Sequence, residues 1–134
     1  MPAGYSGTPL AKKLGFADGL QLWAPAMPED VRAEIERTAH PQFLARPGKA
    51  LAAAHLFHGS ASALQADLSK LRPRLAPGGM IWVSWLKKAS RVPTDITEDT
   101  IRSLALPMGF VDVKVCAVDA VWSGLKLVIR KELR

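Results

Sequence analysis

The sequence contains a single cysteine, Cys116, and no long hydrophobic run. One cysteine excludes a disulfide within the chain and a metal cluster held by several thiolates of the same chain. No apolar stretch approaches the roughly 20 residues that a membrane-spanning helix needs. The N-terminal residues also lack the apolar segment of a secretory signal, so we expect a cytoplasmic protein with no membrane partner.

Clustered basic residues are missing as well, although the formal net charge is +6. Residues 1–67 are neutral, with 6 basic and 6 acidic side chains, whereas residues 68–134 have 12 basic and 6 acidic side chains. A basic half attracts phosphates, nucleic acid or an acidic partner. However, the chain has no RGG tract, no basic helix and no interleaving of aromatic and basic residues, so we expect most of these charges to be solvated surface.

What the sequence does contain is an alternation of strand and helix patterns, and its 134 residues suit a single domain. Turn-forming residues make 1–15 an N-terminal arm with one helical turn, which Gly15 ends. Short strands are predicted over 19–25 and 42–46, with a helix over 28–39 between them.

The stretch ALAAAHLFH, residues 50–58, permits two interpretations. Its alanines favour a helix, whereas Leu-Phe shortly before a glycine suits the end of a buried strand. The next helix has its own serine cap, which favours a strand at least from Ala53 to His58. Whether all of 41–58 is strand stays open at this point.

The second half gives clearer patterns. Gly78 and Gly79 allow a turn into a fully apolar strand, MIWVSWL, and Thr97 starts a helix that Gly109 ends. Strict alternation over 111–117, followed by LKLVIRKEL, predicts a terminal hairpin. The helix before the glycines is predicted to end near a proline and carries leucines at helical spacing, namely Leu64, Leu68, Leu71 and Leu75. The chain is therefore expected to be a single three-layer, Rossmann-like α/β domain, with a mostly parallel sheet and a C-terminal antiparallel hairpin.

The run from Leu75 to Asp95 indicates where a ligand would bind. In open α/β sheets ligands collect beyond the carboxyl ends of the strands, and the strand MIWVSWL leads into a loop rich in cationic and hydroxyl side chains. Such groups could hold a phosphate or a carboxylate. The alternative is a solvated loop in which Thr94 or Asp95 caps the next helix. The candidate binding residues of this loop are Lys87, Lys88, Ser90, Arg91, Thr94 and Asp95.

Two further places carry candidate residues. The arm contains Tyr5, Lys12 and Lys13, and it could fold over the ligand end of the sheet or seal a sheet edge. Sealing is favoured because uncovered edges invite aggregation. Trp122 lies in a WSG turn pattern and is a candidate for an exposed contact, whereas the tryptophans of MIWVSWL are expected in the core.

The histidines and the cysteine give no metal site. On a strand, His55 and His58 point to opposite faces, so they are poorly placed to share a metal ion. His58 could act as a catalytic base, but the sequence shows no partner for it. Cys116 lies in the strand pattern VKVCAV and is expected to be a structural thiol.

Two resemblances bear on the fold. The LRPRLAPGG segment, the strand MIWVSW, the helix ending in MGF and the hairpin VDVKVCAVDAVWSGLKLVIRK resemble the second half of class I methyltransferase folds, over residues 50–134. The blocks YSGTPLAKKLG, HLF, LAPGGMIWVSW, KK-S--PTD-TED and VDVKVCAVD--WSGLKLV also resemble a bacterial family of uncharacterised proteins. This resemblance implies a methyltransferase-like fold with no established activity, and it carries over no catalytic residue.

The sequence departs from methyltransferases at the turn that holds their cofactor. They have a glycine-rich turn after the first strand, because only glycine lets the backbone approach S-adenosylmethionine closely. The corresponding turn here is Ala24-Pro25-Ala26-Met27-Pro28. The acidic residue that would bind the ribose is missing from HPQFLARPG. We therefore expect no S-adenosylmethionine and no other cofactor.

These observations favour a non-catalytic binding or regulatory module for a partner protein or a small anionic ligand. An alternative is an enzyme, either a methyltransferase or a nucleotide-using enzyme, with an atypical site that includes Lys87, Lys88 and Asp95. A third possibility is nucleic-acid binding through the basic second half, which would give a salt-dependent affinity.

Overall fold

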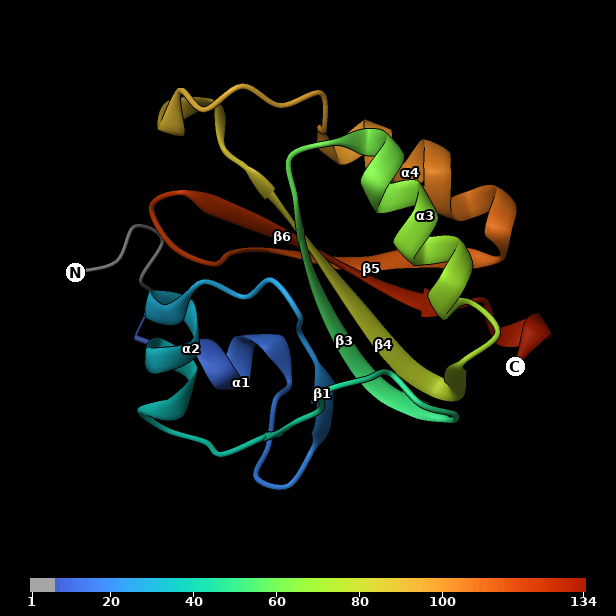
Figure 1. Ribbon diagram of the computed structural model, residues 1–134, viewed down its shortest axis with the longest axis horizontal. Coiled ribbons are helices and arrows are strands. Elements are labelled where there is room, and N and C mark those ends of the chain that lie inside the picture. The colour runs from blue at the N-terminus through green and yellow to red at the C-terminus, as the bar shows by residue number, and fades with distance from the viewer. Residues whose placement is uncertain (1–6) are drawn as a thin grey trace.

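The computed structural model describes residues 7–134, which form one six-stranded sheet with helices on both faces (Figure 1). None of the helices in this described part combines the length and the apolar character needed to cross a membrane. In chain order the elements are α1 (Leu10–Leu14), β1 (Gln21–Trp23), α2 (Glu29–Glu36), β2 (Gln42–Phe43), β3 (Leu51–His58), α3 (Ala61–Leu71), β4 (Leu75–Leu86), α4 (Glu98–Ala105), β5 (Phe110–Ala117) and β6 (Trp122–Ile129).

The strands lie in the order β2-β1-β3-β4-β6-β5. The first four are parallel to one another, and β6 runs antiparallel to both of its neighbours, β4 and β5. The predicted mostly parallel sheet with a C-terminal antiparallel hairpin is therefore confirmed. β2 is a very short edge strand, which suits its position between two prolines.

Each face of the sheet has its own apolar core, because neighbouring residues of a strand point to opposite faces. Helices α1 and α2 cover one face, and α3 and α4 cover the other (Figure 1). On the first face the core includes Leu14, Leu22, Ile35 and Trp82. On the second face it includes Trp23, Leu64, Leu68, Ile81, Ile101 and Phe110.

Side-chain caps confirm two predicted helix starts. Ser60 Oγ accepts a hydrogen bond from the Ala63 N–H at 3.5 Å at the start of α3. At α4, Thr97 and Thr100 form a reciprocal capping box. Gly109 follows α4 with φ +95°, the left-handed conformation that favours glycine after a helix.

The structure corrects the boundary between α3 and β4. β4 begins at Leu75, so Leu75 belongs to a strand rather than to the helix, and the Pro-Gly-Gly segment lies inside the strand. The pairing of β3 with β4 moves from Leu51–Leu75 directly to Ala53–Met80, so β4 bulges between these pairs. The alanine-rich stretch before His58 is strand throughout, from Leu51.

A second bulge corrects the expected alternation in β5. Asp112 pairs with Leu127, but the next pair joins Lys114 to Lys126, so Val113 is an extra residue. Each side chain after Val113 consequently points to the face opposite to the one that strict alternation predicts.

Candidate functional site

The parallel strands β1, β3 and β4 point their carboxyl ends to the same side of the sheet, although β1 ends level with Ala54, before the end of β3 at His58. The turn between β5 and β6 lies at the same edge, since Leu86 at the end of β4 pairs with Trp122 at the start of β6. The chain passes from β1 to α2 on one face and from β3 to α3 on the other (Figure 1). We call the side of the sheet where these strands end the carboxyl edge, which is distinct from the edge strands β2 and β5. Ligands of open α/β sheets bind beyond the carboxyl ends of the strands.

Lys87 and Ser90 fasten the start of the candidate loop. The Lys87 N–H donates to the Val121 carbonyl at 2.9 Å, and Lys87 Nζ donates to the Asp119 carbonyl at 2.5 Å. Ser90 Oγ donates to the Lys87 carbonyl at 2.7 Å and accepts from the Val92 N–H at 3.3 Å. These contacts hold the loop against the β5–β6 turn.

Thr94 and Asp95 fasten the far end of the loop. Thr94 Oγ1 donates to the Gly59 carbonyl at 2.9 Å and accepts from the Ile96 N–H at 3.1 Å. Asp95 Oδ1 accepts from the Ala61 N–H at 2.7 Å. The carboxylate therefore satisfies a free amide at the start of α3, the helix before the loop, rather than α4, the helix after it.

Lys88 and Arg91 are the candidate residues of this loop whose side chains stay free. Both are exposed, and neither side chain forms an ion pair or hydrogen bond with residues 7–134. Arg91 has φ +59°, a left-handed conformation that is uncommon for a residue other than glycine. The loop as a whole is a structural connection that leaves two cations in solvent. Its role in ligand binding stays a prediction.

The cavity described at the carboxyl edge is acidic. It has a volume of about 290 Å³ and lies between the start of α2 and the β5–β6 turn. Asp30, Glu34 and Asp119 line it together with apolar residues. Asp119 Oδ1 accepts from the N–H groups of Val121 and Trp122, both at 2.8 Å. Three carboxylates disfavour an anionic ligand in this cavity.

His58 has a partner that the sequence did not reveal. Its Nε2 lies 2.7 Å from Asp67 Oδ2, and both side chains are partly buried between the end of β3 and α3. A residue nine positions away on the following helix gives no local signal, because the contact depends on how α3 packs. The pair joins α3 to β3.

His55 is buried on the opposite face, as the strand geometry predicted. Its Nε2 lies 2.7 Å from Ser84 Oγ, and Nδ1 has no partner among the described residues. The ring stacks on Phe57 and meets Phe16 edge-on. Burial lowers the pKa of His55 to about 3, so the imidazole is neutral at physiological pH. The part of the chain that is described contains no group of three or more potential metal ligands.

The arm candidates are separated from the carboxyl-edge loop. Tyr5 lies outside the described residues. Lys12 and Lys13 belong to α1, which packs its apolar side on the sheet, and Trp82 Nε1 donates to the Leu14 carbonyl at 2.8 Å. The described arm therefore covers a face of the sheet rather than an edge strand, because its buried residues match the core of that face.

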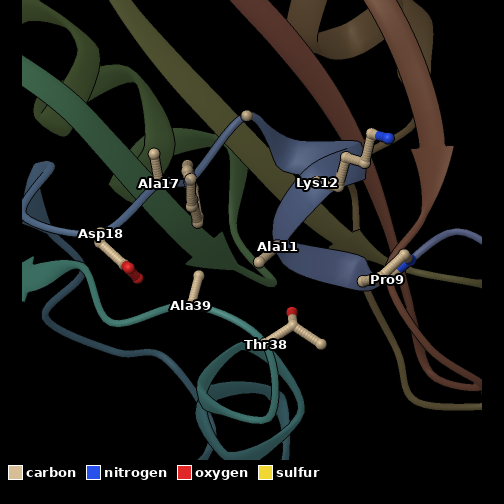
Figure 2. A pocket seen from close by; sticks show the side chains of 9 residues that line it. Pro9, Ala11, Lys12, Ala17, Asp18, Thr38 and Ala39 are labelled. Carbon is tan, nitrogen blue, oxygen red and sulfur yellow. The ribbon is translucent and has the colours of Figure 1, made fainter.

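Beside α1 lies a mostly apolar cavity of about 470 Å³. Figure 2 shows Asp18 and Thr38 directed toward this hollow, whereas the Lys12 amine points away from it. Asp18 Oδ1 already accepts from the His40 N–H at 2.7 Å. The cavity is thus poorly suited to an anion.

Trp122 and Cys116 are both partly buried. Trp122 begins β6 rather than lying in the turn, and its ring meets Phe57 edge-on at 5.1 Å between centroids. Burial raises the pKa of the Cys116 thiol, which keeps it protonated and unreactive. Trp122 contributes to packing on the face of the sheet that α1 covers. Its role in ligand binding stays a prediction.

The turn after β1 lacks the glycines that hold S-adenosylmethionine in methyltransferases. The Met27 N–H bonds to the Ala24 carbonyl at 3.4 Å, and the turn presents Ala24, Pro25 and Ala26 without a glycine. Pro25 has no N–H to offer a ligand. After β2 the chain continues with Leu44, Ala45 and an arginine, so no carboxylate follows that strand to accept from ribose hydroxyls.

Comparison with known proteins relates this architecture to one group of folds. No family model matches the chain, and no curated protein matches it. Among solved structures, a SAM-dependent methyltransferase from Aquifex aeolicus is similar with a TM-score of 0.61 and 13% identity, over 90% of this chain and 87% of that one. The chain has a methyltransferase-like Rossmann fold.

Two further methyltransferases are similar to this chain. The 1,6-didemethyltoxoflavin-N1-methyltransferase of Burkholderia thailandensis, solved with bound S-adenosylhomocysteine, has a TM-score of 0.60 and 17% identity, over 90% of this chain and 74% of that one. Human N-acetylserotonin methyltransferase in complex with SAM has a TM-score of 0.54 and 15% identity, over 89% of this chain and 42% of that one. At such identities the similarity shows the fold and not the activity.

Proposed function

We propose that this chain is a methyltransferase-like domain that acts as a non-catalytic binding or regulatory module for a small anionic ligand or a partner protein. The observation that carries this proposal is the turn after β1. The Met27 N–H donates to the Ala24 carbonyl within this turn. The turn has residues with side chains where methyltransferases have glycines that let the cofactor approach the backbone.

Four described side chains that could act as nucleophiles or bases support the same proposal, because each has a structural role. His55 is buried and neutral, and the Cys116 thiol is stabilised in its protonated form. The hydroxyls of Ser90 and Thr94 are engaged in bonds that shape their own loop. No nucleophile, base and orienting group come together in residues 7–134.

An exposed sheet edge favours the partner-protein form of this function. β5 is an edge strand, and Val113 and Val115 on it leave about half of their surface in solvent, 53% and 47%. An extended segment of another protein could add to such an edge through backbone hydrogen bonds.

The experiment that tests the proposal is calorimetric titration of the full chain with S-adenosylmethionine and with S-adenosylhomocysteine. We expect no saturable binding, which corresponds to a Kd weaker than about 1 mM. Saturable binding of either compound below that limit would overturn the non-catalytic function and favour an enzyme with an atypical cofactor site.

The second candidate function is that of an enzyme, and the His58–Asp67 pair favours it. A base oriented by a carboxylate at the end of β3 has the arrangement that proton transfer requires. If the chain has such an activity, His58→Gln abolishes it while leaving S-adenosylmethionine affinity unchanged. His40→Gln, on the surface, serves as the matched control.

A further inference from the structure

We propose that a cationic groove on the flank of the sheet binds a small ligand carrying two or more linked phosphate groups. This flank groove has a volume of about 540 Å³. The proposal gives a place and a chemical class to the anionic ligand proposed above, and in that sense it rests on the proposed function. The groove is lined by Trp23, Arg46, Gly48, Lys49, Lys70 and Arg74, among others.

The groove lies between α3 and the segment that links β2 to β3. On this face α3 packs over β3, and α4 packs over β5. The segment 44–50, which links β2 to β3, lies beside α3 across the groove. Trp23 is the side chain of β1 that joins the core of this face, and it is 6% exposed. A hollow therefore remains between that segment and the C-terminal half of α3.

Positive charge in the groove is uncompensated. Arg46, Lys49, Lys70 and Arg74 are exposed, and none of them pairs with a carboxylate of residues 7–134. No carboxylate lines the groove. The arginines within α2 and α4 differ, because each of them pairs with acidic side chains. Cations that converge without counter-charges make a favourable site for an anion.

Contacts within the groove already position two of these cations. The Lys70 ammonium lies over the Trp23 ring, 5.1 Å from its centroid. Arg74 Nη1 donates to the Gly48 carbonyl at 3.3 Å, which links α3's end to the opposite wall. The guanidinium has five N–H groups, so the rest of its donors are available to phosphate oxygens.

Linked phosphates fit these observations better than other anions. Four cations on two facing walls suit a polyanion, because linked phosphates carry more negative charge and more acceptor oxygens than a single carboxylate does. The volume lies within the roughly 300–1,000 Å³ of small-molecule sites. Trp23 is buried beneath Lys70, so it offers no free face on which a nucleic-acid base could stack. The groove is therefore suited to binding phosphate groups rather than nucleic-acid bases.

Calorimetric titration of the full chain with inorganic pyrophosphate and with orthophosphate tests the proposal. We expect saturable binding of pyrophosphate that is at least about tenfold tighter than that of orthophosphate, since more charge-assisted hydrogen bonds form. The double variants Arg46→Gln/Lys49→Gln and Lys70→Gln/Arg74→Gln should each weaken pyrophosphate binding by about tenfold or more. All four positions are exposed, so the variants should keep their fold, which circular dichroism checks.

Two matched variants make the test specific. Lys131→Gln removes an exposed cation that does not line the groove and should leave the affinity unchanged. Lys88→Gln/Arg91→Gln removes the free cations of the carboxyl-edge loop and should also leave it unchanged. Absence of pyrophosphate binding at about 1 mM would overturn the proposal, as would an equal loss in the loop variant. Tighter binding of a single-stranded oligonucleotide than of pyrophosphate, at about 0.15 M salt, would also overturn it.

The pyrophosphate titration tests the flank groove separately from the S-adenosylmethionine titration, which tests the non-catalytic function. If the chain binds S-adenosylmethionine, the non-catalytic function fails. The flank groove still stands if pyrophosphate binds equally well to the chain saturated with S-adenosylmethionine. Competition between the two compounds would instead place pyrophosphate at the carboxyl edge and contradict the groove.

Discussion

At the scale of single residues, burial decides what the polar side chains of this chain do. His55 lies in the core between aromatic rings, and its Nε2 is 2.7 Å from Ser84 Oγ. Its pKa falls to about 3 because burial penalises the imidazolium. The unfolded chain therefore binds a proton at mildly acidic pH that the folded chain does not.

This difference predicts that the free energy of unfolding decreases as the pH is lowered. Above the unfolded pKa of 6.5 the contribution of His55 is constant, and it is lost progressively as the pH falls from there toward about 3. Between pH 7 and pH 5 the expected loss is about 2 kcal/mol. Urea unfolding at both pH values measures it.

The control for this prediction is the same measurement on two variants. His55→Gln should reduce the loss of unfolding free energy between pH 7 and pH 5, whereas His40→Gln at the surface should leave it as in the parent chain. Equal pH dependence in the parent and His55→Gln would show that burial of His55 does not cause the effect.

Two adjacent glycines provide a residue-scale prediction about packing. A Cβ at Gly79 would lie 2.8 Å from the Leu51 carbonyl oxygen, whereas a Cβ at Gly78 would meet nothing within 4 Å. Gly79→Ala should therefore destabilise the fold by about 1–3 kcal/mol, because the β4 bulge must shift. Gly78→Ala should change stability by less than about 0.5 kcal/mol. Thermal unfolding that does not distinguish the two variants would contradict this account of the bulge.

At the scale of elements, the candidate loop connects segments that are distant in sequence through hydrogen bonds at both of its ends. Its start holds the β5–β6 turn through Lys87, and its end holds the start of α3 through Thr94 and Asp95. The sequence alone also permits a ligand-binding role for these groups, because polar residues follow the strand whether they contact a ligand or the backbone. Their actual partners are backbone carbonyl and amide groups that only the folded chain brings close.

These hydrogen bonds predict that substitutions at neighbouring positions of the loop differ in their effects on stability and on hydrogen exchange. Asp95→Ala should destabilise the chain by about 0.5–2 kcal/mol, as loss of a helix cap does, and should speed hydrogen exchange of the Ala61 amide. Lys88→Ala, in the same loop without a bonded partner, should leave both quantities unchanged. Unaltered exchange at Ala61 in the Asp95 variant would argue against the cap.

The elements themselves were largely predictable, and the exceptions have local causes. Apolar periodicity and caps located α3, α4 and the β5–β6 hairpin. The bulges at β4 and β5 were missed because one inserted residue or an irregular segment leaves the hydrophobic pattern almost intact. The alanine-rich β3 was ambiguous because alanine favours helices, and burial on both faces of the sheet overrides that preference.

At the scale of the whole molecule, the sheet order confirms a methyltransferase-like fold, while the sites on it differ in charge. The described cavity at the carboxyl edge is lined by carboxylates, and the flank groove is lined by cations. The sequence did not reveal the groove, because its basic residues come from a segment and a helix that are separated along the chain. Arg46 and Lys49 also belong to the half of the chain without net charge, so the excess charge of residues 68–134 could not indicate this site.

We propose that anions bind at the flank groove and that the carboxyl edge takes no cofactor. Two-dimensional ¹H–¹⁵N spectra of the full chain, titrated separately with pyrophosphate and with S-adenosylhomocysteine, test it most directly. We predict that pyrophosphate shifts the amides of Gly48, Lys49 and Lys70 and leaves those of Lys88 and Arg91 unchanged, and that S-adenosylhomocysteine shifts none. Shifts by either compound at Ala24, Ala26 and Gly59, with the groove amides unmoved, would contradict the claim.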